Sequence, residues 1–283
     1  MRDDVLTLSE GRKISYTDCG RPDGPAAVYF HGTGSCRLDH VHLDALFSEI
    51  GVRLVAADRP GIGESSPRPG RTLVESARNT AELADALGID EFAVMGVSAG
   101  GPHAIACAAL LPERVVGLGC VGGLTSPAWD GYWARMSPEA ASILRRGDEQ
   151  AYVKHFEALY GADGSGFPFG PDGLAPPDAA LFDTPATVAR LRRGVDESIR
   201  QGVGGLAHDA VVRAQPWSFD PTDISVETQL YHGVQDVVVD IASSEYTASL
   251  IDQATVVAFP QHGHLSVWEE IPTLLADLTQ PLR

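Results

Sequence analysis

Short apolar runs alternate with stretches of helical periodicity along two separate parts of this chain. Six runs contain few charged residues and most of them end in Gly, Asp or Ser: residues 26–30, 53–58, 92–98, 115–123, 228–233 and 255–260. Such runs are typical of strands that are buried on both faces of a sheet. Strands that alternate with helices predict an α/β fold, in which right-handed crossovers build a mostly parallel, doubly wound central sheet.

Further patterns complete the expected sheet and its helices. Residues 4–9 and 13–19 are separated by Glu10–Gly11–Arg12, which predicts a hairpin ahead of the parallel strands. The clearest helical pattern covers residues 73–87, and Gly88 provides a stop signal after it. Further helices are expected at residues 103–111, 242–251 and 266–278.

Residues 125–216 interrupt this alternation. They contain helical segments, no strong strand pattern, and a Gly- and Pro-rich stretch from 161 to 177. The strand pattern resumes afterwards, so residues 1–124 and 217–283 are predicted to form one domain. A length of 283 residues accommodates an α/β core with one insertion. We therefore expect a helical cap, or lid, at residues 125–216.

Composition narrows the classes of partner and compartment. The formal charge is −17 and the sequence pI is near 4.8, which argues against nucleic acid or an anionic membrane surface as a partner. The four cysteines show no paired spacing, which indicates reduced thiols. The charged N-terminal residues do not resemble a signal peptide, and no apolar run approaches the ~18 residues of a membrane span. The expected location is the cytoplasm.

The segment Gly96–Val97–Ser98–Ala99–Gly100 fits the pattern G-x-S-x-G at the point where a buried strand ends and a helix begins. A serine on such a tight turn has a strained backbone, and flanking glycines relieve the crowding. The turn exposes the hydroxyl above the sheet, and the following helix directs its N-terminal N–H groups toward developing negative charge. Ser98 is therefore predicted to be a nucleophile.

A serine nucleophile needs a base, and histidine is the usual one. His264 is preferred to His262 because it directly precedes the last predicted helix, within Gly263–His264–Leu265. The two histidines could also suggest a metal site, but no third ligand is evident nearby, so no metal is predicted. The pattern requires no cofactor.

An acidic residue should orient the histidine, and Asp236 is well placed in the loop that leaves the strand at residues 228–233. Asp240 is the alternative, although a structural position at the start of the next helix suits it better. His232 is interpreted as a packed residue at the strand end.

Two backbone N–H groups should stabilise an oxyanion. Ala99 follows the nucleophile and is expected to supply one of them. Thr33, in the loop that begins His31–Gly32–Thr33–Gly34, is expected to supply the other. His31 is interpreted as a brace for this loop, with a role as an acid or base as the alternative, and it is also a candidate contact to substrate.

These residues resemble the α/β-hydrolase fold superfamily, specifically its single-cap members related to esterases, epoxide hydrolases and prolyl aminopeptidases. The chain order Ser98, Asp236, His264 is the order of that family. Residues 58–65 look like its D-x-P-G-x-G-x-S turn, and residues 231–236 resemble its W-x-G-x-x-D segment, with Tyr in place of Trp. Haloalkane dehalogenases and epoxide hydrolases use an aspartate nucleophile, which the serine here excludes. An HGGG loop is also absent, because Thr33 follows Gly32.

The resemblance and the triad together predict a serine hydrolase that cleaves a carboxylic ester, thioester or lactone of a small, largely apolar molecule. Amide cleavage by an aminopeptidase, non-hydrolytic lyase or cyclase chemistry, and a non-catalytic receptor remain alternatives. Aromatic residues at the cap are candidate substrate contacts: Trp129, Trp133 and Trp217. Asp209 is interpreted as a structural helix residue. The sequence leaves the oligomeric state open.

Overall fold

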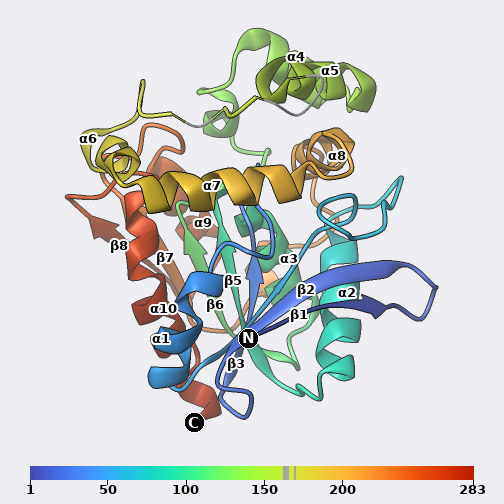
Figure 1. Ribbon diagram of the computed structural model, residues 1–283, viewed down its shortest axis with the longest axis vertical. Coiled ribbons are helices and arrows are strands. Elements are labelled where there is room, and N and C mark those ends of the chain that lie inside the picture. Colours follow the sequence, from blue (N-terminus) through green and yellow to red (C-terminus); the bar gives the residue numbers. More distant parts are fainter. Residues whose placement is uncertain (162–165, 169) are drawn as a thin grey trace.

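An eight-stranded sheet forms the centre of the computed structural model, which describes residues 1–161, 166–168 and 170–283 (Figure 1). The strand order is β1-β2-β4-β3-β5-β6-β7-β8. β1 pairs antiparallel with β2 and β2 antiparallel with β4, whereas all other neighbours are parallel. The strands are β1 (Arg2–Thr7), β2 (Lys13–Gly20), β3 (Ala26–Phe30), β4 (Arg53–Ala57), β5 (Phe92–Val97), β6 (Val115–Val121), β7 (Thr228–Gly233) and β8 (Ala254–Phe259). The predicted mostly parallel sheet is confirmed.

Helices cover both faces of the sheet, as a doubly wound fold requires. Side chains of α1 (Asp44–Glu49) and α10 (Ile271–Leu278) pack into one apolar cluster with the sheet. Side chains of α2 (Val74–Ala86), α3 (Gly101–Leu110) and α9 (Ala242–Leu250) pack into another. The two clusters contain alternate residues of β3 and β5, because successive side chains of a strand point to opposite faces.

The last predicted helix is divided in two. Residues 266–278 form a 3₁₀ helix, η6 (Ser266–Glu270), followed by α10. Pro272 lies in the first turn of α10, where its missing N–H does no harm. Because proline has no N–H to donate to the preceding turn, a continuous helix is interrupted there. The single helical pattern in the sequence therefore gives two helical elements.

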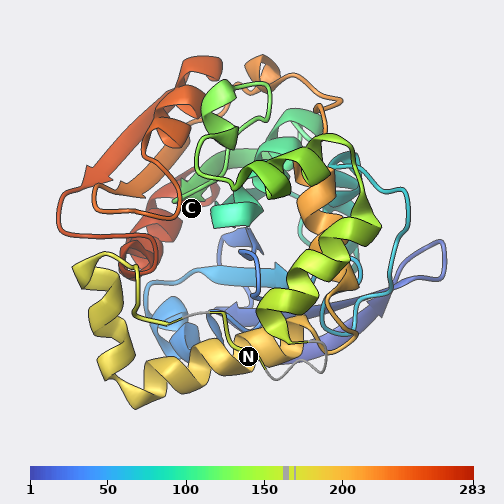
Figure 2. The same ribbon diagram turned by 90° about the horizontal axis from the view of Figure 1, so that it is seen from above.

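Between β6 and β7 the described residues form helices and no strand. The α-helices of this inserted segment are α4 (Pro138–Arg145), α5 (Glu149–Tyr160), α6 (Pro176–Ala179), α7 (Pro185–Ser198) and α8 (Gly204–Arg213). They lie across the ends of the central strands, and from above α6 and α7 follow one side while α4 and α5 follow another (Figures 1 and 2). Side chains of α4, α5, α7 and α8 share an apolar cluster with Cys36, Leu38 and Ile62 of the core.

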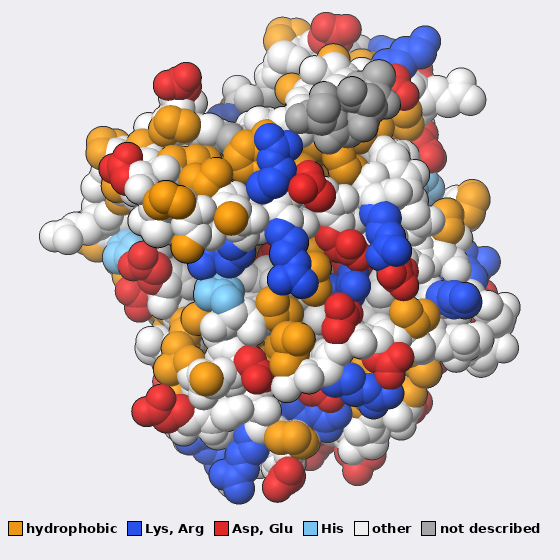
Figure 3. Space-filling view, in the orientation of Figure 1, with side chains coloured by type: hydrophobic (Ala, Val, Ile, Leu, Met, Phe, Trp, Pro, Cys, Tyr) orange, Lys and Arg blue, Asp and Glu red, His pale blue; other side chains and the backbone are white. Residues whose placement is uncertain are grey.

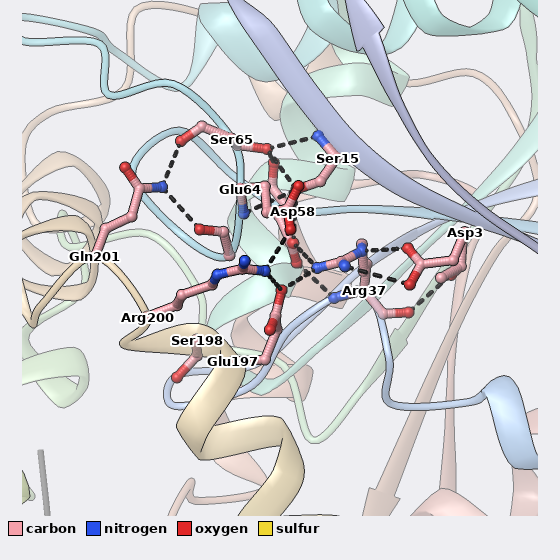
Figure 4. A network of polar contacts seen from close by, with 12 residues as sticks. Asp3, Ser15, Arg37, Asp58, Glu64, Ser65, Glu197, Ser198, Arg200 and Gln201 are labelled. Carbon is pink, nitrogen blue, oxygen red and sulfur yellow. Dashed lines mark hydrogen bonds and ion pairs between the residues drawn. The ribbon is translucent and has the colours of Figure 1, made fainter.

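The C-terminal end of α7 is fastened to the core by a buried ion-pair network (Figure 4). Arg37 contacts Asp58 at 2.7 Å and Glu197 of α7 at 2.6 Å, and its Nε lies 2.7 Å from Asp3 of β1. Asp58 opens the turn that resembles the family's D-x-P-G-x-G-x-S motif. In this chain the aspartate of the motif therefore helps to hold an inserted helix against the sheet.

The surface carries both signs of charge. On the face drawn in Figure 3, Lys and Arg lie interspersed with Asp and Glu, and hydrophobic side chains gather over α6 and α7. All four cysteines are buried and unbridged. No helix of the described residues has both the length and the hydropathy needed to cross a membrane.

Candidate active site

Ser98 occupies the turn between β5 and α3. It has a φ of +51° and is the one non-glycine residue in the described part of the chain with positive φ. Such a conformation is strained for a residue with a side chain. A Cβ at Gly96 would overlap the carbonyl of Gly100, and a Cβ at Gly100 would overlap that of Phe30. Both glycines are therefore required by close backbone packing, which fixes the turn that presents the Ser98 hydroxyl.

Two other predicted residues lie next to Ser98. Nε2 of His264 is 3.1 Å from Oγ of Ser98, and Nδ1 of His264 is 2.6 Å from Oδ2 of Asp236. Asp236 lies just after β7, and His264 lies between β8 and η6. Because β5, β7 and β8 are parallel, their carboxyl ends reach the same edge of the sheet. The fold thus brings together residues that are distant in the sequence.

The surroundings of Asp236 favour its ionised form. Burial alone would raise its pKa, but hydrogen bonds from His232 and His264 outweigh burial and hold the pKa well below its ordinary value. The N–H groups of Val238 and Val239 also donate to Oδ1, each at 2.8 Å. An ionised Asp236 accepts a hydrogen bond from Nδ1–H of His264, which leaves Nε2 without a proton and able to accept the hydroxyl proton of Ser98.

His232 has a larger role than its sequence context suggested. Its Nε2 lies 3.4 Å from Oδ2 of Asp236 and 3.0 Å from the carbonyl of Val239. Its Nδ1 lies 2.8 Å from Oγ of Ser244, which can donate to it. The ring is fully buried. The contact with Ser244 holds it so that Nε2–H faces both the carbonyl of Val239 and the carboxylate of Asp236.

The competing residues lie elsewhere. His262 has its Nε2 3.8 Å from a carboxylate oxygen of Glu270 and packs edge-on against Phe259. Asp240 accepts the N–H of Ala242, the first residue of α9, and pairs with Arg135. Within the described residues no three His, Cys, Asp or Glu side chains are grouped as metal ligands. His262 and Asp240 are thus held in contacts outside the relay.

The predicted oxyanion loop runs against the nucleophile. A Cβ at Gly32 would lie 3.5 Å from Cβ of Ser98, and Thr33 lines the cavity beside Ser98. His31 lies behind this loop: its Nδ1 is 2.9 Å from the carbonyl of Gly32, and its Nε2 accepts the N–H of Arg59. Burial, followed by the charge of Arg59, lowers the pKa of His31 well below its ordinary value. These contacts are those of a neutral brace.

A buried ion cluster supports the same loop. Asp209 of α8 pairs with Arg59 at 3.0 Å, Arg71 at 2.9 Å and Arg213 at 3.3 Å. Burial opposes ionisation of Asp209, but Arg59 and the other cations hold its pKa well below the ordinary value. Arg59 donates to the carbonyls of His31 and Gly32, and Arg213 donates to Oγ1 of Thr33. This cluster therefore places excess positive charge against the loop, and Asp209 has the structural role expected of it.

A cavity of about 820 Å³ opens at Ser98 and His264. Its described lining is largely apolar, and the inserted segment supplies much of it: Phe156, Leu159, Tyr160, Leu174, Leu181 and Leu191. Leu174 lies within the Gly- and Pro-rich stretch, and Leu191 lies in α7. No sequence pattern indicated that either segment lines a cavity. The sequence therefore predicted a cap but not the side chains with which it faces the nucleophile.

The proposed substrate contacts His31, Trp129, Trp133 and Trp217 are not among the described residues that line this cavity, which corrects that part of the expected site. Trp129 stacks on Tyr246, and Trp217 packs on Phe219 against the core. Trp133 donates to the carbonyl of Pro127 and lies under the guanidinium of Arg145. Large rings bury much apolar area where two layers meet, and these three tryptophans serve packing.

Comparisons with known proteins agree with this fold. The family described as the alpha/beta hydrolase fold matches residues 25–271. An uncharacterized hydrolase (YcgS) of Bacillus subtilis is 33% identical over 41% of this chain and 40% of its own length. A non-heme chloroperoxidase of Streptomyces lividans is 28% identical over 96% of this chain and 98% of its own. A thermophilic esterase from Thermogutta terrifontis has a similar fold, with a TM-score of 0.72 and 22% identity over 100% of this chain and 98% of that one.

Proposed function

This chain belongs to the α/β-hydrolase fold family, and from that membership we propose that it is a serine hydrolase whose catalytic residues are Ser98, His264 and Asp236. Its reaction is the cleavage of a carboxylic ester, thioester or lactone through an acyl-enzyme. One observation carries the proposal: a continuous chain of contacts leads from Oγ of Ser98 through His264 to Asp236, at 3.1 and 2.6 Å.

The proposed reaction has two halves. Nε2 of His264 takes the Ser98 proton as Oγ attacks the substrate carbonyl, and the N–H groups of Thr33 and Ala99 stabilise the oxyanion. The protonated His264 then gives its proton to the leaving alcohol or thiol, which leaves the acyl group on Ser98. A water, deprotonated by the same His264, attacks the acyl carbonyl and frees Ser98.

The cavity indicates the class of substrate. A volume of about 820 Å³ is within the range of cavities for small molecules, and an apolar lining favours an apolar acyl or alcohol group. We assign residues 125–216 as the cap of this proposed enzyme, since described residues among them supply much of the cavity wall. A small, largely apolar ester fits these properties, and the mechanism needs no cofactor or metal.

A series of p-nitrophenyl esters of increasing acyl length tests the reaction. Wild-type protein is expected to hydrolyse them and to react covalently with a fluorophosphonate probe, whereas Ser98→Ala does neither. Loss of a member of a serine triad lowers kcat by roughly 10⁴- to 10⁶-fold. Hydrolysis that persists in Ser98→Ala, or folded wild-type protein that the probe does not label, contradicts the proposal.

Two neighbouring pairs of residues offer matched controls. His264→Gln is expected to abolish turnover, whereas His262→Gln, two residues away and outside the relay, retains it. Asp236→Asn is expected to be inactive because an amide favours the wrong histidine tautomer, whereas Asp240→Asn remains active. Equal losses in both members of a pair would show that the loop, not the relay, had been damaged.

Amide cleavage is the second candidate, and the charge of the cavity favours it. Asp39, Asp172 and Glu269 line the cavity together with Arg190, so acidic groups outnumber lysine and arginine among its described residues. A substrate with a free amine would be attracted by this excess. Aminoacyl anilides tested beside the esters distinguish the two: faster turnover of an anilide, abolished by Ser98→Ala, assigns the chain to aminoacyl amides.

A further inference from the structure

Asp178 is a buried carboxylate that the proposed reaction does not use. It belongs to α6, the shortest α-helix of the inserted segment, and its side chain is 0% exposed. Within the described residues it forms no ion pair with an arginine, lysine or histidine. A buried carboxylate without a counter-ion must be stabilised by hydrogen bonds.

Those hydrogen bonds all come from the loop that carries His264. Oδ2 accepts the N–H of His264 at 2.6 Å, and Oδ1 accepts the N–H groups of Leu265 at 3.0 Å and Ser266 at 2.8 Å. The hydroxyl of Ser266 donates to Oδ1 as well, at 2.8 Å. The three N–H groups lie at the start of η6, where they have no partner within the helix. Asp178 caps this helix from a segment 86 to 88 residues away.

The loop is shaped to receive this carboxylate. A Cβ at Gly263 would overlap the side chain of Asp178, so only glycine allows Asp178 to approach. The hydroxyl of Ser266 also accepts the N–H of Gly263 at 2.8 Å. The backbone on both sides of His264 is therefore held against α6, while Asp236 holds the ring of His264.

The position of α6 adds a link to the substrate cavity. Leu174 and Leu181, which flank Asp178 in the chain, both line the cavity. A substrate that packs against these two leucines would therefore contact the segment whose aspartate fixes the His264 backbone. When α6 is displaced, His264 loses the hydrogen bonds that define the position of its main chain.

We propose that Asp178 is a positioning residue for His264, so that the catalytic geometry depends on the docking of α6 of the inserted segment. The inference rests on the proposed role of His264 as the base. Asp178 touches neither substrate nor reacting atoms in this proposal. It acts by keeping Nε2 of His264 within reach of Ser98.

Asp178→Asn offers the sharpest test. An amide can keep its oxygen at the Oδ1 position, where three donors converge, and its NH₂ group then faces the N–H of His264. The variant thus disrupts the His264 contact while preserving most of the cap. A misplacement of about 1 Å can lower a rate by ~100-fold, so we expect kcat for the best ester to fall ~10- to 100-fold, with KM nearly unchanged. Asp178→Ala removes all four hydrogen bonds and should lose more.

Asp183→Asn is the matched control, because Asp183 is an exposed acid in the same part of the inserted segment and should leave kcat unchanged. A spectroscopic readout separates positioning from stability. The proton on Nδ1 of His264, in its short hydrogen bond with Asp236, is expected to give a strongly downfield resonance in proton NMR. In folded Asp178→Asn this resonance should shift or broaden, and the amide protons of residues 264–266 should exchange faster than in wild-type protein.

The outcomes separate this inference from the proposed function. Wild-type kcat in Asp178→Asn, or a loss of activity matched by the loss of folded protein with an unchanged Nδ1 resonance, overturns the positioning role. If wild-type protein hydrolyses no ester or anilide, the proposed function fails, yet the resonance and amide exchange still decide whether Asp178 positions His264. If Asp178→Ala does not fold, Asp178→Asn carries the decision alone.

Discussion

Nε2 of His232 lies 3.4 Å from Oδ2 of Asp236, the same oxygen that accepts the hydrogen bond from His264. The contact makes His232 part of the support for the proposed triad and gives a first prediction. His232→Phe keeps the buried ring but removes its donor. A hydrogen bond to a charged group is worth about 1.5–3 kcal/mol, which corresponds to a loss of ~10- to 100-fold in kcat/KM when it acts in the transition state.

The same variant should change the titration of Asp236. Because His232 helps to lower the pKa of this carboxyl, its removal should raise that pKa, which is measurable as a shift in the titration of the carboxyl carbon in NMR. His262→Phe is the control, since Nε2 of His262 faces Glu270 at 3.8 Å and not Asp236. An unchanged carboxyl titration in His232→Phe would show that His232 merely fills space.

A second prediction concerns Gly100. An alanine there would place Cβ against the carbonyls of Phe30 and His31, which are backbone atoms at the end of β3 and the start of the predicted oxyanion loop and cannot rotate away. We expect Gly100→Ala to destabilise the fold by about 2–4 kcal/mol and to lower the proposed esterase activity. Gly204, the first residue of α8, has open space around its Cβ position. Gly204→Ala should be neutral or stabilise by up to ~1 kcal/mol. Urea unfolding of both variants measures the difference.

The strands could be predicted because their composition is distinctive. β3 and β5 consist of uncharged residues, and all of these residues are buried because helices cover both faces of the sheet. It also predicted which serine, histidine and aspartate come together, because parallel strands end at one edge and the glycines around Ser98 mark the turn. Asp178 was not predictable on this basis. Its partners are three backbone N–H groups and a hydroxyl, and the backbone donors have no signature in the sequence.

The tryptophans show a different limit. Aromatic side chains in an insertion can either face a ligand or pack two layers together, and their position in the chain is the same in both cases. The stacking of Trp129 on Tyr246 and of Trp217 on Phe219 follows from the way α9 and the core meet the inserted segment. Only tertiary packing decides which face of each tryptophan ring is buried and which residues it packs against.

A third prediction tests the network that fastens α7 to the core. Arg37→Met would leave the fully buried carboxylate of Asp58 without its cation. Breaking a buried pair in this way typically costs about 3–5 kcal/mol. Arg200, which belongs to the same network in Figure 4, is 54% exposed at its side chain, and exposed pairs contribute less than ~1 kcal/mol. Arg200→Met should therefore unfold at nearly the wild-type urea concentration. Equal destabilisation by both variants would contradict the distinction drawn here.

Asp39 gives a prediction for the pH dependence of stability. It lines the cavity and accepts hydrogen bonds from Tyr29 and Ser35, yet burial outweighs these contacts and raises its pKa from 3.8 to about 6. The folded state thus keeps a proton that the unfolded state releases between about pH 4 and pH 6, so folding stability decreases as pH rises through this interval. A shift of this size corresponds to at most ~3 kcal/mol, less any screening at the partly exposed carboxyl.

Asp39→Asn removes this ionisation and tests the sign. Relative to wild type, the variant should gain stability as the pH rises from about 4 to about 7, with most of the gain complete near the folded pKa of Asp39. Urea unfolding across this range measures the change, and Asp183→Asn, at an exposed site, should show a constant difference from wild type. If the curves of Asp39→Asn and wild type stay parallel, the Asp39 carboxyl has the same pKa in the folded and unfolded states. Asp39 would then be ionised at all but the lowest pH of the range, a condition that favours the amine-bearing substrates of the second candidate function.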